Sequence, residues 1–399
     1  MKKVDPKVDE AIQTLNMKDG PSRRKLLTGT GLVSATAAAS ALLAACSSSS
    51  SASSSGGTST ASAAAGAIGN FPKTPPWQFW FVNHVTTNLF FVPTQFGFSD
   101  AAALLGLPKP KWGGSQNSIP SEMVTYMQTA ISAKAAGIAT TVINSKPSDT
   151  TFATPVSSAM NAGIPVVSYN ADGPILNGVA TPGTNRLCYV GQALYLSGQQ
   201  MGEQIKSLAK PGKVVIFIAT PGSANIQPRY DGAVSVLSSA GYQVKQVATG
   251  ATTAVEGPAE KAFLLGNKNI TGAFAVDAGS TEELGPTLAA LGLAGKIPAG
   301  GFDLTPGTLT AISTGQIDFT IDQEPYLQGF LPTLYLYLFN LTGGLVFPPN
   351  TDTGLTFVTK STVGPYLNTK TSYEGSAPPP PTLVPRSGPI QNPLATSSV

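Results

Sequence analysis

Residues 213–248 read KVVIFIATPGSANIQPRYDGAVSVLSSAGYQVKQVA, and this stretch decides the fold class. After Lys213 it has an unbroken apolar run at 214–219, which is typical of a strand buried on both faces. A turn rich in Pro and Gly leads to a helical segment at 227–240. Gly241 then follows, at the place where a left-handed helix end is favoured. A second strand-like run at 243–248 completes a strand–helix–strand unit, which predicts a parallel sheet with a right-handed crossover.

The same alternation continues on both sides of this stretch. We expect two doubly wound α/β lobes, because about 300 residues of alternating elements exceed what one such sheet needs. Ser280 and Glu283 have the spacing of a capping box, which predicts a helix start at Ser280. The predicted strands are 77–83, 139–144, 165–168, 187–190, 213–219, 243–248, 272–276, 297–302, 319–322 and 355–359. The predicted helices are 120–136, 154–162, 197–209, 227–240, 254–265, 281–291, 308–314 and 328–340.

Composition argues against several classes of enzyme. The chain has 399 residues, 11% of them charged, with a single histidine, His84, and two cysteines, Cys46 and Cys188. One histidine cannot build a multi-histidine metal site, and two cysteines cannot build a disulfide framework. We therefore expect no catalytic residues, no metal and no cofactor. Cys188 lies in an apolar strand and is expected to be a buried thiol.

The first 46 residues have the features of an export signal. Arg23 and Arg24 precede an uncharged stretch of apolar and small residues that ends at Cys46. A basic segment, an apolar segment and small residues at the end describe a signal peptide. The arginine pair resembles a twin-arginine signal, with the general secretion route as the alternative. Leu43-Ala44-Ala45-Cys46 resembles a lipobox, which implies cleavage before Cys46 and diacylglycerol on its thiol.

The remaining segments outside the body have low-complexity compositions. Residues 47–76 are mostly Ser, Ala, Gly and Thr, and residues 374–399 are rich in Pro, so we expect a disordered tether and a disordered tail. Seven of the 24 basic and four of the 21 acidic residues lie in 1–45, which leaves 17 of each afterwards. The net charge of +3 therefore belongs to the export signal, and nothing in the body favours nucleic acid.

A series of short phrases follows the predicted strands and helices in order. They are Asn88-Leu89-Phe90-Phe91, Ile143-Asn144, Tyr169-Asn170, Gly191-Gln192, Ser197-Gly198-Gln199-Gln200-Met201-Gly202, Arg229-Tyr230-Asp231-Gly232, Val276-Asp277, Gly301-Phe302-Asp303 and Asp322-Gln323. In this order and spacing, the body resembles the ribose-type periplasmic sugar-binding proteins, the substrate-binding components of sugar ABC importers. The resemblance implies two Rossmann-like lobes joined by three crossovers. It also implies an N-terminal lobe of 77–191 plus 324–352 and a C-terminal lobe of 192–323 plus 353–373.

The resemblance also implies a set of ligand-binding residues. Aromatic rings suit the apolar face of a sugar, and planar charged or amide groups suit its hydroxyls. The chain departs from the family at Asn170-Ala171, where Asp-Arg is common, so the identity of the sugar or polyol stays open. The implied ligand-binding residues are Asn88, Phe90, Phe91, Asn170, Arg229, Asp277, Asp303 and Gln323.

The resemblance finally implies partners and a location. We expect an exported, lipid-anchored monomer that binds a monosaccharide or a sugar-like polyol, performs no chemistry and delivers the ligand to an ABC permease. Two alternatives are a receptor of the same fold that informs a membrane kinase or chemoreceptor, and a binder of another small solute such as a nucleoside. A DNA-binding repressor is disfavoured, because the export signal occupies the place of its helix-turn-helix.

Overall fold

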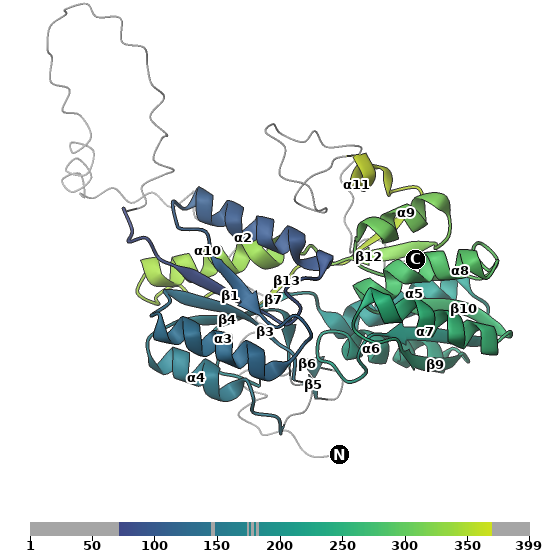
Figure 1. Cartoon of the computed structure of the whole chain (residues 1–399), viewed down its shortest axis with the longest axis horizontal. Coiled ribbons are helices and arrows are strands. Elements are labelled where there is room, and N and C mark those ends of the chain that lie inside the picture. Colours follow the sequence, from purple (N-terminus) through teal and green to yellow (C-terminus); the bar gives the residue numbers. More distant parts are fainter. Residues whose placement is uncertain (1–71, 145–147, 174, 177–178, 181–182, 369–399) are drawn as a thin grey trace, which may run out of the picture. The chain divides into compact units, whose positions relative to one another are not determined.

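A computed structural model describes residues 72–368 apart from 145–147, 174, 177–178 and 181–182 (Figure 1). The predicted signal peptide, Cys46, most of the tether and the whole of the predicted tail lie outside these residues. Among the described helices, none is both long enough and apolar enough to cross a membrane.

The first sheet has six strands in the order β13-β7-β4-β3-β1-β2, and all of its pairings are parallel. Helices α2 and α10 cover one face and α3 and α4 the other, because successive strand residues point to opposite faces. Phe79 and Phe81 thus pack toward α2 and α10, whereas Trp80 and Val82 pack toward α3. The elements are β1 (Phe79–Asn83), α2 (Val92–Leu104), β2 (Lys111–Gly114), α3 (Pro120–Ser132), β3 (Gly137–Val142), α4 (Ala153–Asn161), β4 (Val166–Asp172), β7 (Tyr189–Gly191), α10 (Leu327–Leu341) and β13 (Thr351–Asp352).

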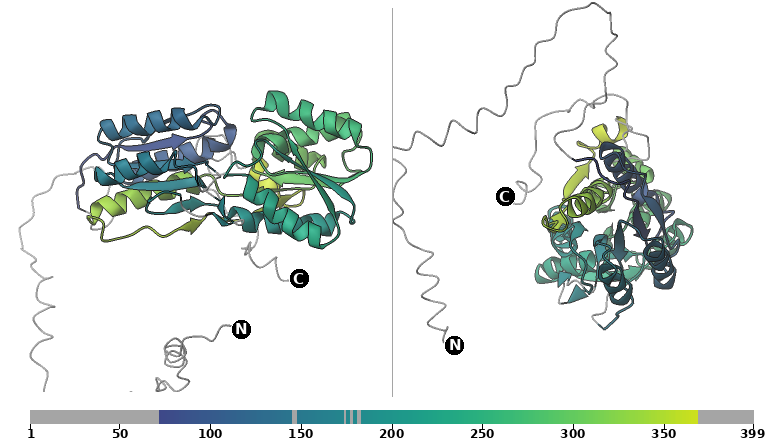
Figure 2. Two further views of the ribbon diagram at one scale, coloured as in Figure 1. Left: turned by 90° about the horizontal axis from the view of Figure 1, so that it is seen from below. Right: turned by 90° about the vertical axis from the view of Figure 1, so that its left-hand side faces the viewer.

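The second sheet has the strand order β14-β12-β11-β10-β8-β9 and is parallel except for β14, which pairs antiparallel with β12. Helices α5 and α6 pack on one face and α7 to α9 on the other (Figure 2). The elements are α5 (Leu194–Leu208), β8 (Lys213–Ile218), α6 (Gln227–Ser239), β9 (Gln243–Ala248), α7 (Thr253–Gly266), β10 (Ile270–Ala275), α8 (Ala278–Ala290), β11 (Ala299–Phe302), α9 (Pro306–Thr314), β12 (Phe319–Asp322) and β14 (Thr356–Thr359). Smaller elements are η2 (Leu89–Phe91), β5 (Ile175–Leu176), β6 (Val179–Ala180) and α11 (Gly364–Asn368).

The chain passes between the two sheets three times. It leaves the first sheet after β7, returns after β12 through α10, and leaves again between β13 and β14. We call the first sheet with its helices the first lobe, and the second sheet with its helices the second lobe. The prediction of two doubly wound α/β lobes joined by three crossovers is confirmed.

Three local predictions were incomplete or wrong. Helix α2 and strand β2 were not predicted from the sequence. The predicted helix start at Ser280 is also wrong, because α8 begins at Ala278 and Ser280 lies inside it. Asp277 is the N-cap, and its carboxylate accepts a hydrogen bond from the Ser280 backbone N–H.

Two glycines bring α5 and α6 into close contact. A side chain on Gly198 would overlap the Arg229 backbone, and one on Gly232 would overlap the Tyr195 carbonyl. Only glycine permits this approach of the two helix backbones. The contact fixes the first turn of α6, and with it the position of the Arg229 side chain.

Candidate functional site

A cavity of about 520 Å³ lies where several strands of both sheets end. The carboxyl ends of strands are where ligands bind in open α/β sheets. The structure brings all eight predicted ligand-binding residues to the wall of this cavity, namely Asn88, Phe90, Phe91, Asn170, Arg229, Asp277, Asp303 and Gln323. Their contact with a ligand stays a prediction.

Arg229 is 2% exposed and lies at the start of α6. Its Nε donates to Gln192 Oε1 at 3.1 Å and its Nη1 donates to the Val276 carbonyl at 3.0 Å. The guanidinium carbon lies 4.3 Å from the centre of the Phe302 ring, a cation–π contact. Within the described residues Nη2 makes no hydrogen bond, so this donor is available to a ligand. Burial lowers the pKa of Arg229, while the nearby Asp303 favours its charged form.

Asp303 and Gln323 form a coupled pair. Gln323 Nε2 donates to Asp303 Oδ1 at 2.6 Å, which leaves Asp303 Oδ2 without a partner among the described side chains. Asp303 has a backbone φ of 78°, an uncommon conformation for a residue other than glycine. Burial raises the pKa of Asp303 to about 6, against the opposing effect of Arg229. Thr305, and not Asp303, caps α9, so the Asp303 carboxylate is not used as a helix cap.

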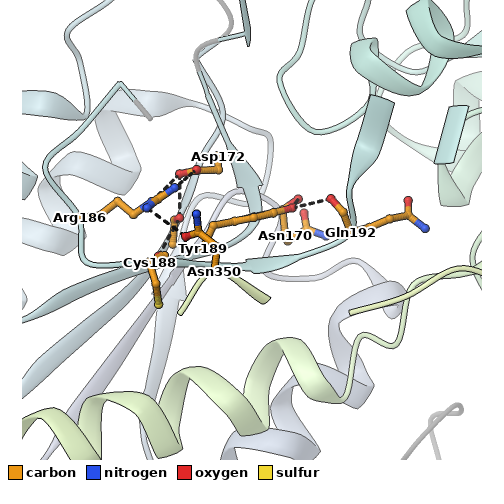
Figure 3. Close-up of polar contacts among 8 residues, drawn as sticks. Asn170, Asp172, Arg186, Cys188, Tyr189, Gln192 and Asn350 are labelled. Atoms are coloured by element: carbon orange, nitrogen blue, oxygen red, sulfur yellow. Dashed lines mark hydrogen bonds and ion pairs between the residues drawn. The ribbon is translucent and has the colours of Figure 1, made fainter. Parts of the chain in front are cut away.

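Asn170 is held by a side-chain contact with α10. Its Nδ2 donates to Gln328 Oε1 at 3.1 Å, and its backbone φ is 60°. The Tyr189 hydroxyl lies 3.0 Å from the Asn170 carbonyl oxygen and 3.2 Å from the Gln192 carbonyl oxygen, so it can donate a hydrogen bond to either one (Figure 3). These contacts fix the Asn170 backbone and leave its side-chain oxygen for a ligand.

Asp172, two residues after Asn170, does not substitute on the cavity wall for the arginine that the sequence resemblance implies at position 171. Its carboxylate forms a buried ion pair with Arg186 and accepts from the Ser168 hydroxyl at 2.7 Å (Figure 3). Neither Asp172 nor Arg186 lines the cavity. Cys188 lies nearby at 1% exposure, and burial raises the pKa of its thiol to about 12, so the thiol is unreactive.

Asp277 has a structural task as well as its place on the cavity wall. Its Oδ1 accepts from the Ser280 backbone N–H at 2.9 Å, and its Oδ2 accepts from the Ala219 backbone N–H at 2.8 Å. The Asp277 carboxylate therefore joins the ends of β8 and β10 and caps α8. Burial raises the pKa of Asp277, and these hydrogen bonds oppose the shift.

Asn88, Phe90 and Phe91 form one corner of the cavity. Asn88 caps η2 by accepting from the Phe90 backbone N–H at 2.9 Å, which leaves its side-chain amide donor free. The rings of Phe90 and Phe91 are perpendicular, with centroids 4.7 Å apart. Phe91 also packs edge-on against His84 and near Trp112, so it serves the core more than Phe90 does.

Glu256 lines the cavity and was not predicted from the sequence. It is 3% exposed, and within the described residues its carboxyl group makes no hydrogen bond. Burial raises its pKa to about 8, with further contributions from Asp277, Glu283 and Glu282. At pH 7 Glu256 is therefore mainly a neutral carboxylic acid that can donate a hydrogen bond.

Glu260 follows Glu256 by one helical turn and lies fully buried against α8. Neither Glu260 oxygen has a hydrogen-bond partner of ordinary geometry among the described residues. Burial raises the pKa of Glu260 to about 10, and the Thr287 hydroxyl opposes the shift. The four-residue spacing of Glu256, Glu260 and Leu264 could have shown from the sequence that both glutamates lie on the buried face of α7.

His84 is a neutral group of the cavity wall. Its Nδ1 lies 3.2 Å from the Thr141 hydroxyl, and its Nε2 lies 3.4 Å from the Asn225 side-chain amide. Donation by Asn225 assigns the proton to Nδ1. Burial lowers the pKa of His84 to about 4.

The groups on the cavity wall suit the binding of a polar molecule. The wall combines one buried guanidinium and several carboxyl groups from the second lobe, amide groups from both lobes, and the phenyl rings of Phe90 and Phe91. Charge-assisted and planar hydrogen bonds of this kind recognise vicinal hydroxyls.

Comparison with known proteins agrees with this fold and site. The family model for the periplasmic binding protein domain matches residues 79–338. The chain is 47% identical over 319 residues to the xylose/arabinose-binding protein XylF of Sulfolobus acidocaldarius, with 77% of each chain covered.

Solved structures show the same architecture. An ABC transporter solute-binding protein from Burkholderia graminis, in complex with D-arabinose, matches with a TM-score of 0.66 and 25% identity, over 74% of this chain and 99% of its own. A carbohydrate transporter protein from Acidothermus cellulolyticus, in complex with myo-inositol, matches with a TM-score of 0.62 and 23% identity, over 72% and 96%. From its sequence, its two-lobed fold and these matches, the chain belongs to the periplasmic binding protein family.

Proposed function

We propose that the protein binds a neutral monosaccharide between its two lobes and supplies it to an ABC importer. The observation that carries the proposal is the shared cavity. Asn170 from the first lobe and Arg229 and Asp303 from the second all present unused polar atoms to the same space. Like its relatives of known ligand, the protein has a binding task and no catalytic one.

A pentose is the favoured ligand class. The 47% identical relative is named a xylose/arabinose-binding protein, and the 25% identical structure holds D-arabinose. The two lobes already touch beside the cavity, where the Ala224 backbone N–H donates to the Ile143 carbonyl at 3.4 Å. A ligand that forms hydrogen bonds to both lobes should stabilise this arrangement, because the ligand makes all of its contacts only when the two lobes are closed around it.

The charges on the cavity wall favour an uncharged ligand over an anionic one. Arg229 is the sole Lys or Arg among the described lining residues, whereas Asp277, Asp303, Glu282 and Glu283 are acidic. Sugar phosphates and sugar acids would bring a negative charge toward these carboxyl groups, at a cost in a poorly solvated site. We therefore expect aldoses to bind and their phosphates to be rejected.

A thermal-shift screen tests the proposal. Purified protein is mixed with pentoses, hexoses, polyols, sugar phosphates, nucleosides and amino acids. A ligand at 100 times its Kd adds roughly 2.7 kcal/mol to the free energy of unfolding, so a true ligand raises Tm clearly. If a nucleoside or an amino acid raises Tm and no sugar or polyol does, the proposal is wrong.

The anchor and the delivery step complete the proposal. The sequence supports cleavage before Cys46 and acylation of its thiol, which adds two buried chains and gives stable attachment to the membrane. We also propose that the lobes comprise 77–191 with 324–352, and 192–323 with 353–373; the division of the described strands between two sheets supports this. Cys46→Ser should move the protein from the membrane fraction to the soluble fraction in fractionated cells, and retention in the membrane would contradict the anchor. Purification of the protein with its membrane partner distinguishes import from sensing. Recovery of a permease would support import, and recovery of a membrane kinase would support sensing.

A further inference from the structure

Three consecutive large hydrophobic residues are exposed at one end of the first lobe. Leu345, Val346 and Phe347 are 89%, 45% and 66% exposed. The other exposed large hydrophobics among the described residues stand singly along the chain. Scattered apolar residues need no explanation, but an exposed run of this kind marks an interaction site.

This apolar tip, Leu345–Phe347, is presented in a defined conformation. It begins three residues beyond the end of α10, and the Leu345 backbone N–H donates to the Thr342 carbonyl at 3.3 Å. The Val346 N–H donates to the Thr342 hydroxyl at 3.1 Å. The Phe347 ring packs edge-on against Phe339, with centroids 5.8 Å apart. The end of α10 therefore supports the tip and holds it outward.

The tip lies at the amino edge of the first sheet, opposite to the strand ends that reach the cavity. It connects α10 to β13, which runs parallel to β7. The described chain begins at this same edge, beside α10 (Figure 1). There the Trp77 ring contacts Tyr337 of α10, with centroids 5.6 Å apart. Asn340 near the end of α10 donates to the Ala136 carbonyl, just before β3, at 2.8 Å.

Exposed lysines lie at this same end of the first sheet, before or at the start of β1, β2 and β3, whereas the tip leads into β13 at the other side of the sheet. Lys73 precedes β1, Lys109 and Lys111 lie at the start of β2, and Lys134 precedes β3. The segments 72–80, 104–112, 132–138 and 338–350, which form the edge, contain no Asp or Glu. The edge therefore combines a small exposed apolar tip with a positive charge, although the exported chain as a whole is neutral.

We propose that this edge rests on an anionic lipid surface, with Leu345 and Phe347 inserted among the lipids and the lysines near the headgroups. Basic residues are attracted to anionic lipids, and a few apolar side chains add binding energy when they enter the interface. Three side chains present too little area for a stable protein–protein interface. The chain also enters the body at this edge, so the anchor proposed at Cys46 would lead the chain to it. The inference goes beyond sugar binding and does not depend on it.

Vesicle co-sedimentation tests the proposal. The mature chain that we propose, residues 46–399, carries Cys46→Ser and so lacks both the signal peptide and the acylation site; it is mixed with phosphatidylcholine vesicles with or without phosphatidylglycerol. We expect sedimentation with the anionic vesicles, weakened by salt. Leu345→Ser with Phe347→Ser should lower the partition constant roughly tenfold. Lys73→Gln, Lys109→Gln and Lys134→Gln together should lower it by a similar factor and remove the salt dependence.

A matched control separates the tip from general surface hydrophobicity. Leu196 and Leu265, which are 47% and 49% exposed on the second lobe, are changed to Ser together and should leave sedimentation unchanged. The proposal is overturned if the parent does not sediment with anionic vesicles, or if the tip and control variants behave alike. It is also overturned if the tip variant only abolishes self-association in analytical ultracentrifugation. Sugar calorimetry on the tip variant should match the parent, so a failure of sugar binding is recognised separately.

Discussion

Arg229 serves the fold with two of its nitrogens and leaves the third for a ligand. Replacement with Ala should remove the charge-assisted hydrogen bond that we propose between Arg229 and the sugar, so affinity should fall roughly 10- to 100-fold. The Gln192 side chain and the Val276 carbonyl lose their donor as well, so Tm without ligand should also fall. Calorimetry and thermal unfolding of Arg229→Ala measure both effects. An unchanged affinity would remove Arg229 from the site.

Glu256 should act as a hydrogen-bond donor to the ligand. Glu256→Gln keeps a donor of similar shape and should bind sugar nearly as well as the parent at pH 7. Glu256→Ala should bind about fivefold more weakly, which is the worth of one ordinary hydrogen bond.

The pH dependence distinguishes this role from simple packing. Because the pKa of Glu256 is about 8, ionisation above that pH removes its proton, and sugar affinity of the parent should decline. Glu256→Gln should not show this decline. Calorimetric titrations at pH 7 and pH 9 make the comparison, and parallel pH profiles for parent and variant would rule out the donor role.

At the residue scale, the sequence predicted which residues line the cavity but not the hydrogen bonds that these residues make. The eight predicted residues follow strand ends or begin helices, and parallel strands bring such positions to one edge. The sequence could not show that the Asp277 carboxylate is used to cap α8, because capping depends on the backbone geometry of β8 and β10. The sequence also did not show whether Asp172 is available to a ligand. The structure shows that its carboxylate forms an ion pair with Arg186.

At the scale of the element, α7 packs on α8 through Glu256 and Glu260 in their neutral forms. Their folded pKa values, about 8 and about 10, exceed the ordinary value of 4.5. The folded state therefore holds protons that the unfolded chain releases, so stability falls as pH rises from 4.5 through these values. His84, with its pKa lowered from 6.5 to about 4, acts in the opposite sense and only below pH 6.5.

We therefore expect Tm without ligand to decrease steadily between pH 6.5 and pH 10. Glu260→Gln keeps the shape and cannot ionise, so this variant should lose much of the decrease. Exposed Glu203, changed to Gln, is the matched control and should keep the parent profile. Thermal unfolding followed by circular dichroism gives the profiles. A parent Tm that rises over this range would contradict the neutral state of the two buried glutamates.

Helix α2, which was not predicted from the sequence, lacks the apolar periodicity of an amphipathic helix. The buried positions of α2 are Pro93, Thr94, Gly97, Phe98, Ala101 and Ala102, so small and polar residues replace the apolar stripe. Its glycine is required by the neighbouring helix, because a side chain on Gly97 would overlap the Tyr326 carbonyl of the α10 region. Tertiary contact, rather than local pattern, determines this helix. The strands that were predicted are buried apolar runs, which local sequence reveals directly.

At the scale of the whole molecule, side-chain amides tie together the three segments that join the lobes. Gln192 in the first segment donates to the Gly354 carbonyl in the third at 3.2 Å. Gln328 donates to the Gln323 carbonyl at 3.1 Å and to the Thr353 hydroxyl at 3.2 Å. Arg229 contacts this network through Gln192, and Asp303 contacts it through Gln323. Two residues of the cavity wall are therefore hydrogen-bonded to the connecting segments, which are the expected hinge between the lobes.

The central claim is that the cavity binds a neutral sugar, and isothermal titration calorimetry of the full chain with D-xylose and L-arabinose tests it most directly. A few charge-assisted hydrogen bonds in a closed cavity correspond to a Kd on the order of 1 µM. We predict one binding site per chain with such an affinity for at least one of the two pentoses, and no binding of its phosphate ester. Heats no larger than dilution for both pentoses and for hexoses and polyols, with binding of a nucleoside or an amino acid instead, would contradict the account.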